Sequence, residues 1–369
     1  MFQKIKNQYH LLQAAAANIL YGFPSRRLKV IGITGTDGKT TTTTLVYHIL
    51  KSSGRSVSMI STINADIAGH KYDLGFHVTT PDSFMIQRFL KMSADNNDEF
   101  FVLETTSHAL DQNRVWGIRF EVGAITNITH EHLDYHGTFE EYKKTKLKLF
   151  KMANSGIMDS NQNEKIIENL PNLTRFNKQN YSVAYRICKY LGLDDSEIIK
   201  AMKTFILPKG RMEIVYDHEF KIIIDFAHTP NALFELLPEI RKKYLKNSGK
   251  MIHVFGAAGL RDATKRPMMG EASNKYSDKI ILTEEDYRTE DPIIICKTIA
   301  SKIKDNKYEI IINRVEAIKK AISIAKRDDV IVITGKGHEK SLCRGKLEYL
   351  YSEHEAVSSG LKELKKVKS

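Results

Sequence analysis

The chain has 369 residues, of which 42% are hydrophobic and 27% are charged, and its formal net charge is +12 with a pI of about 9.3. This length allows two domains with cores of their own, and the composition is that of an ordinary globular protein. The lysine surplus forms no arginine-rich run or aromatic-basic repeat, and the three cysteines form no CxxC pair, so nucleic acid, a zinc ribbon and a disulfide framework are not indicated.

Residues 1–27 precede the first expected strand and are interpreted as a helical extension. Their apolar content is too low for a secretory signal, and no cleavage site is evident. We expect this helix to pack on the protein's own surface, with contact to a membrane surface as the open alternative. Because no apolar run is long enough to span a membrane and the cysteines fit a reducing compartment, a cytoplasmic protein is expected.

From residue 28 onward, strand-like apolar runs alternate with helical patterns. This alternation predicts a mostly parallel sheet with helices on both faces. A polar, poorly periodic region follows from about Met152 to Thr174, and then a pair of helices. The strands are expected at 28–34, 56–62, 100–106 and 121–129, and the helices at 41–53, 139–151, 180–193 and 194–207.

Residues 208–212 read as a linker, after which the alternation restarts with strands at 220–227, 250–259, 278–285, 308–314 and 329–337. The expected domains are therefore an N-terminal helical extension at 1–27, a central domain at 28–207 and a C-terminal domain at 208–369. The fold class is α/β: a central mostly parallel sheet of the phosphate-loop type, followed by a Rossmann-like α/β domain.

The stretch IGITGTDGKTT at 31–41 joins an expected strand to an expected helix. Glycines at 35 and 38 allow backbone N–H groups to close on phosphate oxygens, and the helix N-terminus adds a partial positive charge. The strict phosphate-loop rule wants four residues between its first glycine and Gly-Lys-Thr, whereas five separate Gly32 from Gly38. Lys39 is suited to the β- and γ-phosphates, and a hydroxyl of Thr40 or Thr41 to Mg²⁺. The residues predicted to bind nucleotide are Gly35, Thr36, Asp37, Gly38, Lys39, Thr40 and Thr41.

Further motifs occur in a characteristic order: ETTSHALDQNRV at 104–115, TNITHEHLDYHG at 126–137, YKKTKLKLF at 142–150, DFAHTPNAL at 225–233, GLRDATKRPMMG at 259–270 and GKGHE at 335–339. Together with TGTDGKTT they resemble the Mur ligase family, and within it the MurE-type enzymes, from about Leu28 to Val357. The resemblance implies an ATP-dependent ligase of peptidoglycan precursor synthesis that adds a diamino acid to a muramoyl-dipeptide through an acyl phosphate.

The resemblance also implies site residues. Lys39, Glu104, His132 and Lys146 are expected to be catalytic, and Thr40, Glu104, His132 and Lys146 to hold Mg²⁺, with two ions expected. Composition alone would make Lys146 a solvated lysine, but the family pattern implies a carbamylated metal ligand. Beyond the loop, Asn180, Arg211 and His228 match nucleotide-contacting positions. The acceptor is matched by Thr79, Thr80, Thr106, Gln112 and Arg114, and the amino acid by Arg261, Glu285, Asp286, Tyr287, Arg288, Gly335 and Glu339.

Two departures leave alternatives open. The family's selector for meso-diaminopimelate is Asp-Asn-Pro-Arg, whereas this chain has Glu-Asp-Tyr-Arg at 285–288. The retained Arg288 favours meso-diaminopimelate, and the loss of the asparagine and proline leaves lysine as the alternative. Only about 27 residues precede the first strand, and the central domain is short after residues 156–164, so a uridine-binding domain and a small sheet are expected to be missing. Three alternatives follow for a chain without that domain: a protein partner replaces it, the acceptor carries no UDP, or the chain has a non-catalytic regulatory role.

Overall fold

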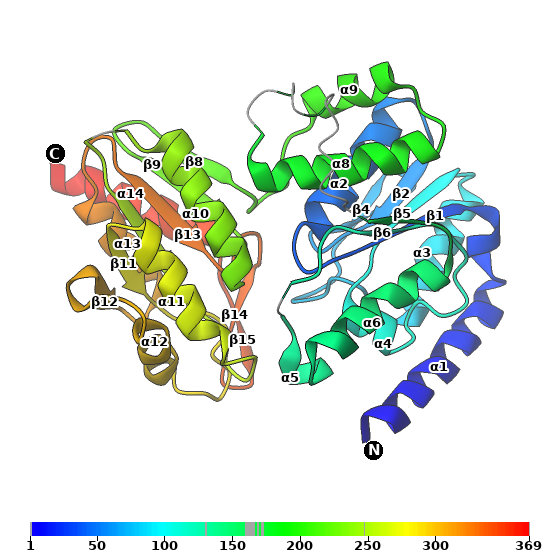
Figure 1. The fold of residues 1–369 in the computed structure, drawn as a ribbon, viewed down its shortest axis with the longest axis horizontal. Helices are drawn as coiled ribbons and strands as arrows, with labels where there is room; N and C mark the ends of the chain where they lie inside the picture. Colours follow the sequence, from blue (N-terminus) through cyan, green and yellow to red (C-terminus); the bar gives the residue numbers. More distant parts are fainter. Residues whose placement is uncertain are drawn as a thin grey trace. The chain divides into compact units, whose positions relative to one another are not determined.

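The computed structural model describes residues 2–129, 131–158, 167, 170, 173–246 and 248–368. The chain divides into two compact units, Met1–Pro208 and Lys209–Ser369, and each contains its own sheet. We call them the N-terminal unit and the C-terminal unit (Figure 1).

The N-terminal unit is built on a seven-stranded sheet with the order β4-β3-β2-β5-β1-β6-β7. Strands β2, β5, β1, β6 and β7 pair in parallel, and among the described residues only the β2–β3 and β3–β4 pairings are antiparallel, so the expected mostly parallel sheet is confirmed. The strands are β1 (Lys29–Thr34), β2 (Val57–Ile60), β3 (Ala65–Ile67), β4 (His70–Tyr72), β5 (Phe100–Glu104), β6 (Phe120–Ile125) and β7 (Ala153–Met158).

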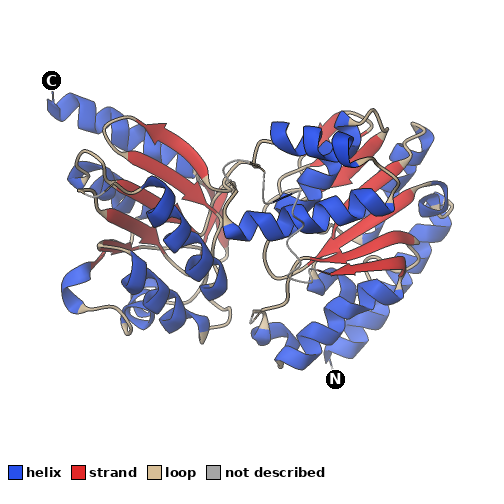
Figure 2. Cartoon of the chain, turned by 45° about the horizontal axis from the view of Figure 1, so that its top comes forward, coloured by secondary structure: helices blue, strands red, loops and turns tan. Residues whose placement is uncertain are grey.

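Helices cover both faces of this sheet because its central strands are apolar on both sides. Ile31 packs in one core with α2 and α8, whereas its neighbour Val30 packs in another with α3, as the period of two in a strand requires. Figure 2 shows the helices around the strands. The helices are α1 (Phe2–Tyr21), η1 (Pro24–Arg27), α2 (Lys39–Ser52), α3 (Ser83–Asp95), α4 (Ser107–Asp111), α5 (Leu133–His136), α6 (Phe139–Lys151), α8 (Arg175–Tyr190) and α9 (Asp195–Thr204).

One strand of this unit lies in the polar region that shows little periodicity in the sequence. The polar region that starts at Met152 opens with a regular strand, β7, which pairs in parallel with β6. Only Ile157 of β7 is buried, so this edge strand carries almost none of the apolar signal by which strands are recognised. The expected shortening after residues 156–164 falls largely outside the described residues.

The C-terminal unit has a six-stranded sheet with the order β12-β11-β10-β13-β9-β8, parallel except for β8, and a separate hairpin of β14 and β15. Helices α10, α11 and α12 pack on one face, and α13 and α14 on the other. This is the expected Rossmann-like arrangement. The elements are β8 (Glu213–Asp217), β9 (Lys221–Asp225), α10 (Pro230–Tyr244), β10 (Met251–Phe255), α11 (Lys265–Tyr276), β11 (Lys279–Leu282), α12 (Pro292–Ala300), η2 (Asp305–Lys307), β12 (Tyr308–Ile310), α13 (Arg314–Ile324), β13 (Val330–Thr334), β14 (Ser341–Arg344), β15 (Leu347–Leu350) and α14 (Glu353–Lys368).

Side-chain caps define where several of these helices begin. Asp82 accepts hydrogen bonds from the second and third residues of α3, and threonine hydroxyls at 138, 174 and 229 cap α6, α8 and α10. Such caps satisfy N–H groups that have no partner within the helix. The first residues of these four helices are therefore specified locally by the sequence, including those of the two longest of them, α8 and α10.

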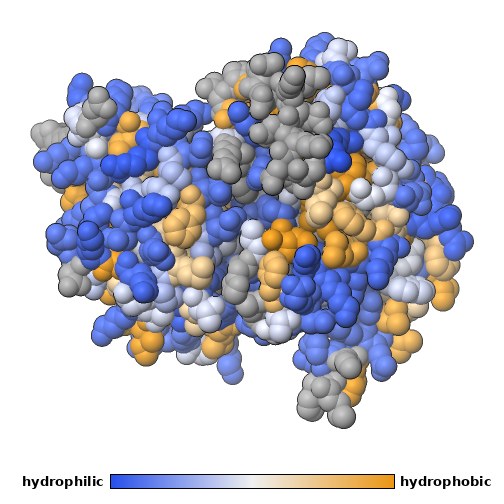
Figure 3. Space-filling model, viewed as in Figure 1, coloured by the Kyte–Doolittle hydropathy of each residue, from blue (hydrophilic) through white to orange (hydrophobic). Residues whose placement is uncertain are grey.

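Helix α1 packs against α3 with one face, which includes the buried Ala14 and Ala17. Its other face exposes apolar side chains, among them Leu12 (70%) and Ile19 (71%), and Figure 3 shows apolar surface along the lower right edge, where α1 lies in Figure 1. Packing on the protein's own surface is thus observed. In the part of the chain that the structure describes, no helix is long and apolar enough to cross a membrane.

Candidate functional site

The glycine-rich loop lies between the end of β1 and the start of α2, at the carboxyl edge of the first sheet. Gly35 and Gly38 have φ values of 153° and 81°. A Cβ on Gly35 would lie 1.8 Å from Thr126 Oγ1, and one on Gly38 would lie 2.0 Å from Asn180 Oδ1, so neither position has room for a side chain. Gly38 caps α2 without a side-chain hydrogen bond, and the helix N-terminus carries the partial positive charge that binds anions.

Two lysines direct their amino groups at the backbone of this loop. Lys39 Nζ donates to the carbonyl oxygens of Gly35 at 3.0 Å and Thr36 at 2.8 Å. Lys146 Nζ, which comes from α6, donates to the same Gly35 oxygen at 2.7 Å and lies 4.6 Å from the centre of the Tyr142 ring. Both lysines therefore meet at one carbonyl of the loop.

Lys146 is 1% exposed, so the solvated position suggested by composition alone is wrong. It belongs to the buried face of α6, whose spacing of three and four residues places it with Tyr142, Thr145 and Leu149. Burial lowers the pKa of Lys146 well below the usual range of lysine, and the charge of Lys39 lowers it further, while Asp37 and Glu131 act in the opposite direction. The surroundings of Lys146 therefore destabilise its charged form.

Glu104 ends β5 beside the same loop and is buried. Its Oε1 accepts hydrogen bonds from Thr40 Oγ1 at 3.0 Å and Thr62 Oγ1 at 2.8 Å, and its Oε2 accepts one from the Thr62 backbone at 2.8 Å. Neighbouring oxygen ligands of an octahedral Mg²⁺ lie about 2.9 Å apart, which matches the spacing of the Thr40 and Glu104 oxygens. Hydroxyl and carboxylate oxygens are also the donors that Mg²⁺ prefers, so these residues fit the ion.

His132 lies in a cluster of aromatic and imidazole rings after β6. Its ring centroid is 5.0 Å from that of His108 and 6.0 Å from that of Tyr142. The Tyr142 hydroxyl lies 3.0 Å from Thr36 Oγ1, so this cluster borders the glycine-rich loop. The predicted role of His132 as a metal ligand stays a prediction.

The five residues predicted to bind the acceptor form one connected group. Thr80 is its centre, because its Oγ1 accepts from the Thr106 backbone at 3.0 Å and its carbonyl accepts from Arg114 Nη1 at 2.8 Å. Arg114 Nε also donates to Gln112 Oε1 at 2.8 Å, and Thr79 joins through a 3.2 Å contact with the Thr62 hydroxyl. The Thr80 hydroxyl donates to the backbone of Glu104, so the group adjoins the Mg²⁺-compatible pair.

The three nucleotide residues predicted outside the loop fall in both units. Asn180, on α8, is buried against Gly38. Arg211 and His228 belong to the C-terminal unit, where both lie at Phe226: the Arg211 guanidinium carbon is 4.5 Å from the ring centre, and His228 Nδ1 is 2.9 Å from the Phe226 carbonyl oxygen. Arg211 and His228 thus share one small surface of that unit.

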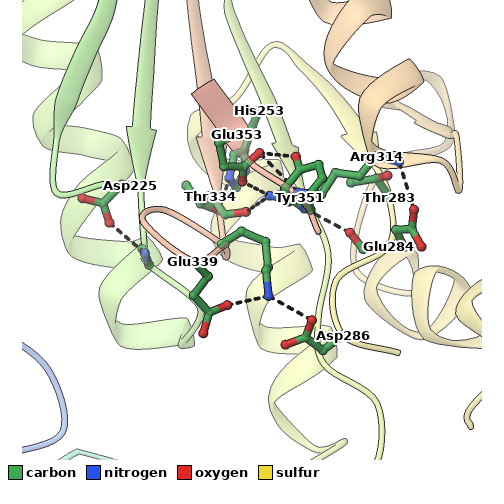
Figure 4. Close-up of polar contacts among 12 residues, drawn as sticks. Asp225, His253, Thr283, Glu284, Asp286, Arg314, Thr334, Glu339, Tyr351 and Glu353 are labelled. Carbon is green, nitrogen blue, oxygen red and sulfur yellow. Dashed lines mark hydrogen bonds and ion pairs between the residues drawn. The ribbon is translucent and has the colours of Figure 1, made fainter. Parts of the chain in front are cut away.

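The residues predicted to bind the amino acid lie mainly on two segments that follow β11 and β13. The buried Lys336 joins these segments, because its Nζ lies 2.9 Å from Asp286 Oδ1 and 2.5 Å from Glu339 Oε2 (Figure 4). Gly335 is beside Glu285, since a Cβ at Gly335 would lie 2.9 Å from Glu285 Oε2. Glu339, which was expected to meet an ammonium group, therefore has the ammonium of Lys336 as its neighbour.

Three other residues of this predicted pocket are held differently. Arg288 has a φ of 53°, and its Nη1 donates to the carbonyl oxygens of Gly259 at 2.8 Å and Asp286 at 3.2 Å. The Tyr287 backbone donates to the Glu285 carbonyl at 2.8 Å. Arg261 is exposed, so it is the member of the set that burial constrains least.

Two residues that touch these sites, Thr62 and Lys336, were not predicted from the sequence. Thr62 is the last residue of an expected strand, a position that often carries function in parallel sheets, so its place was recognisable. Lys336 stands inside the quoted GKGHE motif together with its neighbour Glu339, but its burial also depends on Asp286, which comes from a distant part of the chain.

Glu285 leads to a prediction on the pH dependence of stability. Burial raises the pKa of its carboxyl to about 7, and the charge of Asp286 adds to this shift. The folded state keeps a proton that the unfolded chain releases above about pH 4.5, so the free energy of unfolding falls as the pH rises from 4.5 to 7. Replacing Glu285 by glutamine should therefore raise the free energy of unfolding at pH 8 by up to about 3 kcal/mol, and much less at pH 4.5.

Urea unfolding of the ligand-free protein at the two pH values measures this difference. Glu355→Gln, at an exposed position, is the control and should show no such pH-dependent gain. A Glu285→Gln protein that is less stable than the parent at pH 8 would contradict the raised pKa.

The glycine-rich loop brings together a lysine, a helix N-terminus and a pair of oxygens suited to Mg²⁺, and this combination of groups is suited to phosphoryl transfer. This site, together with the Rossmann-like C-terminal unit, is typical of ATP-dependent ligases that form amide bonds. Family models of the Mur ligase middle domain and of the Mur ligase glutamate ligase domain match residues 33–204 and 210–337. The chain belongs to the Mur ligase family.

Individual relatives support this assignment. The chain is 36% identical to UDP-N-acetylmuramoyl-L-alanyl-D-glutamate–2,6-diaminopimelate ligase 1 of Clostridium acetobutylicum, over 98% of this chain and 83% of that protein. It is 37% identical to the corresponding ligase of Aquifex aeolicus, over 93% and 79% of the two chains. The first alignment runs over 408 positions, more than this chain has residues, so the aligned part of that relative holds residues without a counterpart here.

Solved structures agree on the fold. A UDP-N-acetylmuramoyl-L-alanyl-D-glutamate–2,6-diaminopimelate ligase is 27% identical with a TM-score of 0.55, covering 91% of this chain and 78% of that one. A bifunctional folylpolyglutamate synthase/dihydrofolate synthase from Yersinia pestis, complexed with AMPPNP and Mn ion, has a TM-score of 0.68 at 18% identity, over 88% and 90% of the chains. The second likeness concerns the fold alone.

Proposed function

We propose that this protein joins a diamino acid to a muramoyl-dipeptide in an ATP-dependent reaction of peptidoglycan precursor synthesis. The observation that carries the proposal is the meeting of Lys39, Lys146 and Glu104 around the glycine-rich loop of a chain that is 36% identical to a diaminopimelate ligase. In this proposal residues 28–207 form the ATP-binding domain and residues 208–369 the second ligase domain, with residues 1–27 as a helical extension.

The reaction would proceed in two steps. The terminal carboxylate of the acceptor attacks the γ-phosphorus of ATP, which forms an acyl phosphate and releases ADP. The amine of the amino acid then attacks the acyl carbon, the C–N bond forms, phosphate leaves and the nitrogen loses a proton. Lys39 and the N-terminus of α2 would stabilise the negative charge on the transferring phosphoryl group.

Thr40, Glu104 and His132 would hold Mg²⁺ in this scheme. When bound, the ion neutralises phosphate charge and polarises the phosphoryl oxygens. The support for Thr40 and Glu104 is their 3.0 Å oxygen spacing, and the support for His132 is the closeness of its ring cluster to the loop.

We also propose that Lys146 carries a carbamate. A neutral, buried amine can add CO₂ with loss of a proton, and the product bears carboxylate-like oxygens that could join a second Mg²⁺. The lowered pKa of Lys146 supports this, because only the unprotonated amine reacts.

On the substrate side, the connected group of Thr79, Thr80, Thr106, Gln112 and Arg114 would bind the acceptor, and Asn180, Arg211 and His228 would contact the nucleotide. Arg261, the 285–288 segment, Gly335 and Glu339 would bind the amino acid. The retained Arg288 favours meso-diaminopimelate, since its guanidinium can pair with a second carboxylate. The Asp286–Lys336 ion pair, where the family pattern has asparagine, keeps lysine as the alternative.

The test is ADP release by the purified chain with ATP, Mg²⁺ and UDP-muramoyl-dipeptide, comparing meso-diaminopimelate with lysine. We expect release that requires both the acceptor and meso-diaminopimelate. Dependence on lysine instead would correct the amino acid. No release with either would point to a non-UDP acceptor or a protein partner, and nucleotide binding without any stimulated hydrolysis would favour a regulatory role.

A further inference from the structure

Arg314 has the largest fully buried side chain among the described residues, and it lies at the start of α13 in the C-terminal unit. It belongs to none of the predicted sites. Burying a guanidinium costs free energy unless its N–H groups form hydrogen bonds, so the hydrogen-bond partners of Arg314 show which parts of the fold it stabilises.

The guanidinium of Arg314 binds three separate parts of the unit (Figure 4). Nη1 donates to the Glu284 carbonyl oxygen at 3.1 Å, and Nη2 donates to the Thr334 carbonyl oxygen at 2.7 Å. The carboxylate of Glu353 accepts from Nη2 at 2.5 Å and from Nε at 3.4 Å. One side chain therefore connects the ends of two strands and the start of α14.

Both carbonyls stand directly before predicted amino-acid-binding residues. Glu284 precedes Glu285 and the 285–288 segment, and Thr334 precedes Gly335. Glu284 and Thr334 are also held by other side chains. Arg344 donates to the Glu284 carboxylate at 2.5 and 2.9 Å, and Thr334 Oγ1 lies 3.0 Å from His253 Nε2.

We propose that Arg314 is a positioning residue that sets the separation of the 285–288 and 335–339 segments and thereby the shape of the amino-acid subsite. The expected effect on amino-acid binding rests on the proposed function, whereas the contacts of Arg314 do not depend on it. Arg314 touches no reacting atom in this proposal. It acts through the backbone of the two segments that carry the predicted ligands.

Arginine is suited to this role by its shape. Its planar fork places donors on several sides, whereas a lysine ammonium on a flexible stem cannot reach two carbonyls and a carboxylate from one buried position in the same way. Stability alone explains the pair poorly, because replacing a buried ion pair by apolar residues of similar volume is often neutral or stabilising.

Glu353 and Tyr351 hold the guanidinium in place. Glu353 is fully buried, and the Tyr351 hydroxyl donates to its Oε2 at 2.5 Å. Tyr351→Phe would remove one hydrogen bond from the support of Arg314 while leaving its three direct partners. This milder variant keeps the proposal testable if a substitution of Arg314 prevents folding.

The test combines hydrogen exchange and kinetics on the full chain. In Arg314→Lys, exchange of the backbone amides at 285–288 and 335–339 should rise by about tenfold or more in both segments together, while that of α10 stays unchanged. The KM for the amino acid should rise by about tenfold or more, which corresponds to about 1.4 kcal/mol, with the KM for ATP changed by less than about twofold. Tyr351→Phe should shift both readouts in the same direction by a smaller factor.

Arg241→Lys is the matched control, because Arg241 also binds a carboxylate, Asp278, and a carbonyl, that of Tyr276, but at the amino end of β11. It should leave both segments and both KM values unchanged. Unchanged exchange in the two segments of Arg314→Lys would overturn the proposal, as would equal changes in Arg241→Lys. The exchange measurement needs no substrate, so it decides the proposal even if the ligase activity itself is not found.

Discussion

Replacing Lys39 by alanine is expected to lower acceptor-dependent ADP release by at least about 10²–10³-fold, the range seen when one preorganised group that stabilises transition-state charge is removed. Lys39 is the side chain whose Nζ lies against the carbonyls of Gly35 and Thr36, within the loop that would enclose the phosphates. The effect should fall on kcat, since the charge that Lys39 stabilises develops on the transferring phosphoryl group.

Lys51→Ala is the matched control for this experiment. Lys51 lies at the opposite end of α2, where its Nζ donates to the Tyr47 hydroxyl. It should keep the turnover of the parent. Unchanged turnover in Lys39→Ala would refute phosphoryl transfer at this loop.

Replacing Lys146 by alanine is expected to lower ADP release by about 10²-fold or more, because the proposed metal-ligating carbamate and the contact of Lys146 Nζ to Gly35 would both be lost. The proposed carbamate has a signature of its own. With ¹³C-labelled bicarbonate, the parent protein should show a carbamate carbon by NMR, and Lys146→Ala should not.

Lys148→Ala tests whether this signal is specific. Lys148 lies on the same helix, but it is only half-buried and pairs with Asp111. It should keep both the signal and the activity. A parent enzyme that shows no carbamate signal and is insensitive to removal of CO₂ would disprove the modification, while leaving the ligase reaction intact.

Several features were accessible from the sequence because they depend on short stretches of chain. The parallel sheets follow from the alternation of apolar runs and helical patterns, and both sheets have the parallel core that this pattern predicts. The helix after the glycine-rich loop was expected at 41–53 and is observed at Lys39–Ser52. The local chemistry of glycine and of strand-to-helix connections explains this success.

Short or solvated strands could not be found in the same way. Every residue of β15 is exposed, and β4 has no buried residue, so neither strand shows the alternation of apolar and polar residues that identifies a strand. The edge strand β7 has only one buried residue and likewise lacks this alternation. These strands exist because a neighbouring backbone offers hydrogen bonds, which is a property of the folded chain.

By itself, then, the sequence determined where a phosphate-binding loop stands and which α/β class carries it, because backbone freedom at glycine and the apolar period act locally. Only the tertiary structure decided that Lys146, Arg314 and Lys336 are buried and what each of them touches. A charged side chain is as compatible with solvent as with an interior partner, and its burial is stable only where strand ends far apart in the chain bring carbonyls and carboxylates to it.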